Sequence, residues 1–130
     1  MMQVTEENTL NIETLKKRPD FLRVASVRKK WVTPAMIIQT APRPIEAANE
    51  LRVGYTASKK VGNAVARSRA KRRMREVVRK CLGPCASKNH DYVIIARQEI
   101  LTYAFDQLIR DLKWALKRLH TQSKDKKEGV

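Results

Sequence analysis

The apolar and polar positions of the chain repeat with different periods, and each period predicts one kind of secondary structure. After Pro19, apolar residues at positions 21, 24 and 25 have the spacing of a short helix with one buried edge. Residues 35–41 (AMIIQTA) predict a strand, which a shorter strand around 28–32 can precede. Alternation from Leu51 to Ala57 predicts another strand that buries one face.

The second half of the chain predicts two longer helices around a buried strand. A helix over 63–82 begins at Asn63, a good N-cap residue, and ends before the Gly83-Pro84 pair. Residues 91–97 (DYVIIAR) are mostly apolar, as in an interior strand. A steady apolar stripe then predicts a last helix over 102–120. The element order α-β-β-(β)-α-β-α is typical of an α+β fold, here a two-layer α-β sandwich.

A chain of 130 residues is long enough for one domain with a modest core. Residues 1–13 are polar and lack a period, so we expect a flexible N-terminal segment there. The domain itself is predicted over 14–121. The tail over 122–130 (QSKDKKEGV) has nothing to bury, which predicts a disordered basic segment.

Charge narrows the class of partner. The chain carries 28 Lys and Arg against 13 Asp and Glu, a formal net charge of +15 that favours a polyanion. Nucleic acid is favoured over a membrane surface, because the most basic segment has Ala, Val and Met opposite its charges. The first residues lack a signal-like apolar region, and the stretch 31–41 is too short and polar to span a bilayer, so we expect a cytoplasmic protein.

The predicted helix over 63–82 has two opposite faces. At about 100° per residue, one stripe is apolar; it holds Ala66, Ala70, Met74, Val77 and Cys81. The opposite arc is basic and holds Arg69, Arg72, Arg75, Arg79 and Lys80. Arginine suits bidentate contacts with phosphate, so this arc predicts a nucleic-acid surface. A solvated basic helix or a localisation signal is the alternative interpretation.

Protein-based catalysis finds little support in the sequence. His90 precedes a strand and His120 ends a helix, with no carboxylate or serine at a telling spacing. Cys81, Cys85 and His90 lack a fourth ligand in a recognised zinc spacing. We therefore predict no catalytic residue and no metal site in this chain.

The basic segment carries a family resemblance. Residues 59–76 (KKVGNAVARSRAKRRMRE) resemble the signature of the bacterial ribonuclease P protein subunit, roughly K-K-x-G-N-A-V-x-R-N-R-x-K-R-x-x-R-E. The chain departs from it at Ser68, where the family has Asn. The segments 15–21, 51–54 and 91–97 resemble the family's first helix, central strand and later strand, so the resemblance spans about 14–120.

The resemblance implies a left-handed βαβ crossover and two binding surfaces. The surface for the catalytic RNA would comprise Lys59, Lys60, Asn63, Arg67, Ser68, Arg69, Lys71, Arg72, Arg75 and Arg79. A cleft for the single-stranded 5′ leader of precursor tRNA would contain Lys17, Phe21 and Tyr55. Ala25 stands where the family has a second aromatic residue, and the first strand offers Met36, Ile37 and Ile38 instead of one. As an alternative, Phe21 is an ordinary core residue.

The implied function is that of a protein subunit of an endoribonuclease whose RNA subunit, with Mg²⁺, carries out the chemistry. The implied partners are ribonuclease P RNA and precursor tRNA, with one protein per RNA and neither DNA nor membrane. A structural RNA-binding protein of the ribosomal kind is the alternative. A DNA-binding repressor is disfavoured, because the basic helix has few base-reading residues and no helix-turn-helix partner precedes it.

Overall fold

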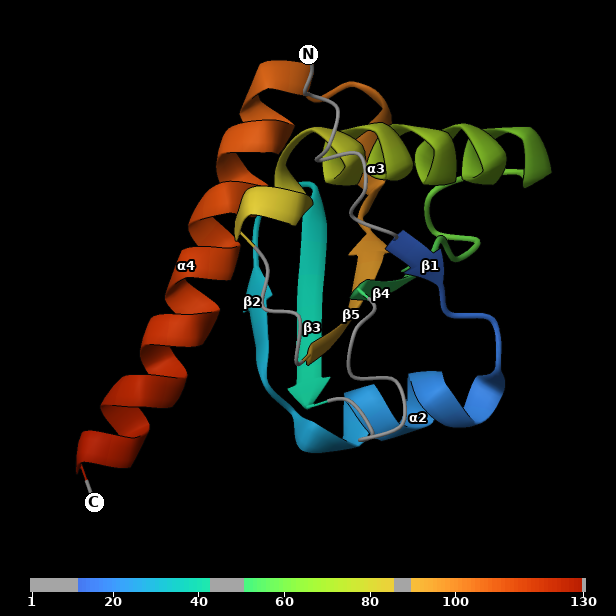
Figure 1. Cartoon of the computed structure of the whole chain (residues 1–130). Coiled ribbons are helices and arrows are strands. Elements are labelled where there is room, and N and C mark those ends of the chain that lie inside the picture. The colour runs from blue at the N-terminus through green and yellow to red at the C-terminus, as the bar shows by residue number, and fades with distance from the viewer. Residues whose placement is uncertain (1–11, 43–50, 86–89, 130) are drawn as a thin grey trace, which may run out of the picture.

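A computed structural model describes residues 12–42, 51–85 and 90–129 of the chain. Its elements, in chain order, are β1 (Ile12–Thr14), α2 (Arg18–Val27), β2 (Lys30–Val32), β3 (Met36–Pro42), β4 (Leu51–Thr56), α3 (Ala64–Cys85), β5 (His90–Ala96), the 3-10 helix η3 (Gln98–Leu101) and α4 (Phe105–Gly129) (Figure 1). This arrangement confirms the predicted α+β class and the order of the predicted elements.

The strands form one mixed sheet in the order β1-β4-β5-β3-β2. β1 and β5 both run parallel to β4, whereas β3 is antiparallel to β5 and to β2. β4 and β5 are therefore parallel neighbours joined through α3, which makes a βαβ unit. In the register, Gly54 lies opposite Val93 and Tyr55 opposite Ile94, so these two pairs point to opposite faces of the sheet.

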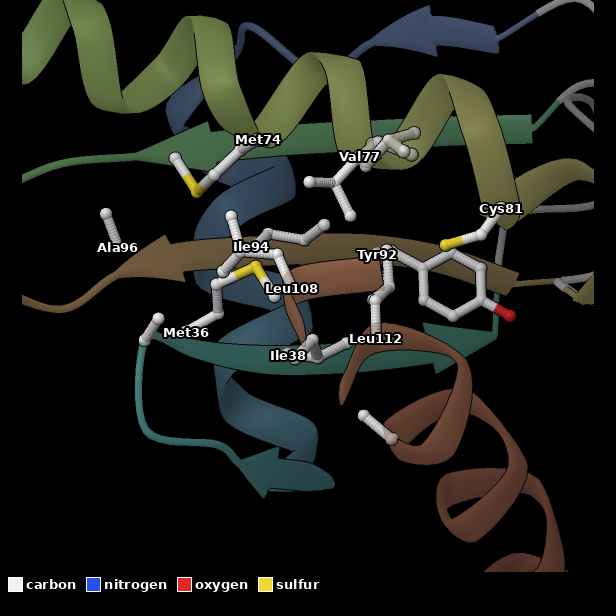
Figure 2. Close-up of a cluster of buried hydrophobic side chains, with 14 of the residues drawn as sticks. Met36, Ile38, Met74, Val77, Cys81, Tyr92, Ile94, Ala96, Leu108 and Leu112 are labelled. Carbon is white, nitrogen blue, oxygen red and sulfur yellow. The ribbon is translucent and has the colours of Figure 1, made fainter. Parts of the chain in front are cut away.

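The main core lies between the sheet and the pair α3 and α4. Buried side chains from β3, β5, α3 and α4 meet there, among them Met36, Ile38, Met74, Val77, Tyr92, Ile94, Leu108 and Leu112 (Figure 2). Residues 36, 38, 92 and 94 alternate along their strands, as expected for one buried face. This packing makes the two-layer sandwich that the sequence predicts.

Helix α2 covers part of the opposite face of the sheet. It begins at Arg18 with Pro19 in its first turn, and it ends at Val27, followed by the C-cap residue Arg28, whose φ of 62° is left-handed. Its Val24 and Phe21 pack in a second cluster with Leu15, Ala41, Val93 and Ile95. Phe21 lies directly over Gly54, where an added Cβ would be 2.6 Å from the aromatic ring. A side chain at position 54 would therefore push α2 off the sheet.

A buried carboxylate ties α2 to the sheet. Asp91, at the start of β5, is fully buried and receives Arg52 Nε on Oδ1 at 3.0 Å and Arg52 Nη2 on Oδ2 at 2.6 Å. Arg23 of α2 donates Nη2 to Asp91 Oδ2 and Nη1 to the carbonyl oxygen of Pro42. Burial alone would raise the pKa of Asp91, but the hydrogen bonds from Arg52 and Arg23 outweigh it and hold that pKa below its ordinary value.

Two described elements extend beyond the predicted domain bounds of 14 and 121. Ile12 and Glu13 were expected in a flexible segment, yet they belong to β1, because their backbone pairs with β4. Residues 1–11 lie outside the described part of the chain. Helix α4 continues to Gly129, within the segment 122–130 that the sequence predicts to be disordered, and Val130 lies outside the described part of the chain.

The boundaries of the two long helices also differ from the prediction. The Gly83-Pro84 pair lies in the final turn of α3 and not after it. Proline has no backbone N–H to donate, but only Cys85 follows it in the helix, so the missing hydrogen bond disturbs little of α3. Helix α4 starts at Phe105 rather than Thr102, because η3 and a turn occupy the preceding residues. Within the described residues, no helix is long and apolar enough to cross a membrane.

We expect Asp91→Asn to lower the free energy of unfolding by about 3 kcal/mol at neutral pH, because it leaves two arginines without their buried counter-charge. The measurement is urea unfolding. The matched control is Glu76→Gln, which removes an exposed pair with Arg79 and should cost less than about 1 kcal/mol.

The difference in unfolding free energy between the native chain and Asp91→Asn should depend on pH in one direction. Because folding lowers the pKa of Asp91, its ion pairs stabilise the protein above the ordinary value of 3.8 and lose that effect as pH falls through the lower folded value. The difference between the native chain and Asp91→Asn should therefore be full at pH 5–7 and shrink below about pH 4. An equal difference at all pH values would contradict this assignment.

Candidate nucleic-acid interface

Helix α3 begins with a cap that the sequence identifies. The backbone N–H of Ala66 donates to Asn63 Oδ1 at 2.9 Å, which satisfies one of the free donors of the first turn. Gly62 precedes the cap with a φ of 149°, a conformation that other residues rarely adopt. Asn63 and Gly62 therefore direct the basic helix across the sheet. The amide oxygen of Asn63 is already engaged in this cap.

The two predicted faces of α3 are confirmed by burial. Four of the five stripe residues are fully buried, namely Ala70, Met74, Val77 and Cys81, while Ala66 is half-buried. All five residues of the opposite arc are exposed: Arg69, Arg72, Arg75, Arg79 and Lys80. We call these five the arginine arc. Four guanidinium groups and one ammonium group on a single helix face repel one another, so a polyanion bound there would relieve that repulsion.

The other residues of the segment that were predicted to bind RNA divide into two kinds. Lys59, Lys60 and Ser68 are exposed, whereas Arg67 and Lys71 are half-buried. Arg67 Nη1 donates to the carbonyl oxygen of Gly62 at 3.0 Å, so this arginine also fixes the start of the helix.

Arg73 has a structural role that the sequence does not reveal. Its Nη2 donates to the carbonyl oxygen of Tyr103, and its Cζ lies 5.8 Å from the ring centroid of Phe105. It therefore joins α3 to the start of α4.

Tyr55 lies on the α3 side of the sheet. The Cζ of Arg75 is 5.4 Å from its ring centroid, and a small cavity of about 180 Å³ adjoins the two residues. Burial raises the pKa of Tyr55 to about 12, with Arg75 opposing that rise, so the phenol stays neutral. The predicted cleft placed Tyr55 beside Phe21. Phe21 packs over Gly54, and the side chain of the next strand residue, Tyr55, points to the opposite face of the sheet. The two residues therefore do not line one cleft.

The α2 side of the sheet carries an open groove of about 750 Å³. Ile37 of β3, Ile95 of β5 and Val32 of β2 line its apolar part. Its polar rim is lined by Ser58, Lys60, Arg97, Gln98 and Glu99. Ile95 also packs against the cluster that contains Phe21, so the groove and Phe21 share one face of the sheet.

The predicted cleft residues Lys17, Phe21 and Tyr55 are not among the residues that line this groove. Phe21 is half-buried over Gly54, which is intermediate between a core residue and an exposed stacking platform. Lys17 is exposed and precedes α2 as its N-cap. Met36 and Ile38 belong to the main core, and of the three apolar residues of that strand only Ile37 lines the groove. The continuous apolar run of β5 is the signal that could have indicated Ile95, because such a run has apolar residues on both faces.

The two histidines lie together at one end of the sheet. Their ring centroids are 5.4 Å apart, and His120 Nε2 is 2.9 Å from the hydroxyl of Tyr92. Burial lowers the pKa of both rings, and the charge of Lys29 lowers each further. No three His, Cys, Asp or Glu residues within the described ranges gather into a group that could hold a metal ion.

Comparisons with known proteins agree over most of the chain. The family model described as Ribonuclease P matches residues 11–120. The ribonuclease P protein component of Paramagnetospirillum magneticum is 50% identical over 110 residues, which cover 83% of each chain. That of Ruegeria pomeroyi is 46% identical over 110 residues, covering 84% of this chain and 87% of the relative.

Solved structures of the same kind share the fold. The RNase P protein from Thermotoga maritima superposes with a TM-score of 0.67 at 27% identity, covering 82% of this chain and 96% of that one. The RNase P protein of Staphylococcus aureus gives a TM-score of 0.65 at 28% identity, covering 80% of this chain and 92% of that one.

Proposed function

The chain belongs to the ribonuclease P protein family, and from this premise we propose that it binds ribonuclease P RNA and the 5′ leader of precursor tRNA. In this proposal it works in the cytoplasm, one protein per RNA, and assists the endonucleolytic removal of the leader. The observation that carries the proposal is the arginine arc, five exposed cations on one rigid helix face.

The arginine arc supports binding to the RNA subunit by its charge and its rigidity. The buried stripe of α3 anchors the helix on the sheet, so the guanidinium groups stand in fixed order on the outer surface. Neutralising a row of phosphates by such groups releases counterions and makes binding strongly salt-dependent.

The groove supports binding of a single-stranded leader on the other face of the sheet. Its floor is aliphatic, with Ile37 and Ile95, and its polar rim carries two cations, Lys60 and Arg97, and one acid, Glu99. An unpaired strand could place bases on the apolar floor and phosphates near the rim. Phe21 would add one aromatic edge beside it, and Lys17 one further cation.

The chemistry would belong to the RNA. Asp20 and Asp91 share the same two partners, because each carboxylate pairs with Arg23 and Arg52. Carboxylates that are already paired with arginines do not suit a Mg²⁺ ion held by the protein. The magnesium ions would be held by RNA, and the chain would lower the concentration they require by screening phosphates.

Reconstitution tests the proposal. Addition of the purified protein to ribonuclease P RNA should stimulate 5′ cleavage of precursor tRNA at low Mg²⁺, while the protein alone should cleave nothing. Gel analysis of the cleaved leader measures both. A structural RNA-binding protein of the ribosomal kind would bind RNA without stimulating cleavage, and cleavage by nuclease-treated protein alone would contradict the assignment of the chemistry to RNA.

The arginine arc predicts a salt effect. Replacing Arg69, Arg72 and Arg75 together by Ala should flatten the plot of log affinity for ribonuclease P RNA against log salt by about 0.7–0.9 per lost phosphate contact. The fold should survive, because these side chains are exposed. The matched control replaces the exposed Lys16, Arg18 and Lys30, which removes the same charge elsewhere. Equal slopes for the two triple variants would place the RNA outside the arc.

Phe21 predicts a difference between the two forms of tRNA. Phe21→Ala in the holoenzyme should weaken binding of precursor tRNA about tenfold, equivalent to about 1.4 kcal/mol, and leave mature tRNA unchanged. Phe21→Leu keeps the contact with Gly54 and should fall between the two. Leu22→Ala, an exposed neighbour on α2, is the control. Equal losses for both tRNAs, together with a lower melting temperature, would make Phe21 a core residue only.

A further inference from the structure

A third surface, distinct from the arginine arc and the groove, combines two indole rings with one guanidinium group. The Cζ of Arg118 on α4 lies 5.5 Å from the ring centroid of Trp31 on β2 and 5.7 Å from that of Trp114 on α4. We call these three residues the tryptophan clamp. Trp31 is far from Trp114 and Arg118 in the sequence, so the clamp forms only in the folded chain.

The clamp presents an exposed aromatic face. Trp114 is 52% exposed, whereas Trp31 is half-buried and packs against the main core. A half-exposed indole offers an apolar ring and a polar N–H to a binding partner. The surroundings are basic, since Arg110 and Lys117 stand four residues before and three residues after Trp114 and are both exposed. The nearest acid in that spacing, Asp111, accepts the hydroxyl of Tyr103 at 3.0 Å.

Arg118 has N–H donors that no described residue accepts. Among the residues that the structure describes, its guanidinium forms no hydrogen bond or ion pair, and its buried Nε lacks an acceptor. Cation–π contacts with two rings hold a guanidinium group in place without using its N–H donors. A fixed, unsatisfied guanidinium is suited to phosphate.

The position of the clamp indicates which RNA can reach it. Helix α3 packs on β4 and β5, and α4 packs on β2 and β3, over the same face of the sheet (Figure 1). The clamp therefore lies on the side of the arginine arc but toward the opposite edge of the sheet. The groove proposed for the leader lies on the other face, where Val32 rather than Trp31 lines it.

We propose that the tryptophan clamp binds one unpaired nucleotide of ribonuclease P RNA, with its base stacked on Trp114 and its phosphate on Arg118. This rests on the proposed function and adds a second RNA contact to the arginine arc. An indole face accepts any base, so the site selects an unpaired nucleotide and not a particular sequence.

Intrinsic fluorescence offers a direct test, because the chain contains two tryptophans and both belong to the clamp. Titration of the native chain with ribonuclease P RNA should quench the emission in a saturable way. An eight-nucleotide oligoadenylate should also quench it, whereas an abasic strand of equal length and charge should not. Binding of either RNA, followed by anisotropy of a labelled strand, with no change in tryptophan emission would overturn the proposal.

Variants separate stacking from charge and from packing. Trp114→Leu should weaken binding of ribonuclease P RNA about tenfold with little change in salt slope, because a stacking contact is lost and a phosphate contact is not. Trp114→Phe should restore most of the affinity. Arg118→Lys keeps the charge but loses the planar stack, and it should fall between them. Val27→Ala, an exposed apolar residue on α2, is the control.

The remaining outcomes are distinguishable. Stimulation of cleavage by the native chain with unchanged RNA affinity of a folded Trp114→Leu would overturn the clamp and leave the proposed function intact. Failure of the native chain to stimulate cleavage would contradict the proposed function. A loss specific to precursor tRNA would assign the clamp to the leader, and a concentration-dependent dimer abolished by Trp114→Leu would assign it to a second copy; both would overturn the proposal. Melting temperatures of all variants identify any that are unfolded.

Discussion

The buried carboxylate of Asp91 is the interaction on which the rest of this structure depends. It joins β5 to β4 through Arg52 and to α2 through Arg23, so one charged group fixes three segments that are distant in the sequence. A carboxylate without access to water is stable only with such partners. Helix α2 therefore has one position on the sheet, and the groove is the part of that face which α2 leaves uncovered.

Size, as much as charge, determines how closely the layers approach. Gly54 lets the ring of Phe21 rest on β4, and Ala70 is buried where α3 meets the main core. Because these contacts are close, the arginine arc lies on the outer side of α3, where Arg75 also lies over the ring of Tyr55 on β4. Arg67 and Arg73 have other roles, since they fix the start of α3 and its contact with the loop before α4. The same helix thus supplies both core and charged surface.

The arginine arc lowers the stability of the isolated chain through repulsion between like charges. Glu76, which pairs with Arg79 at 3.1 Å, is its only acid within α3, and the other cations of the arc have no counter-charge on that helix. Self-repulsion of this kind opposes the compact state and is reduced when a polyanion binds. The tryptophan clamp accommodates a positive charge in a different way, because Arg118 contacts two aromatic rings and not an acidic side chain. Both arrangements support the proposal that the chain binds a polyanion.

The sequence by itself determined what depends on neighbours along the chain. The Asn63 cap, the buried and exposed faces of α3, the strands β3, β4 and β5 and the α+β class follow from local spacing, and the family follows from the basic segment. It could not place Tyr55 and Phe21 on opposite faces, pair Asp91 with Arg23, or bring Trp31 to Arg118. Those relations depend on strand order and register, which join residues far apart in the chain and leave no periodic trace in it. Tertiary structure therefore decided which predicted residues share a surface.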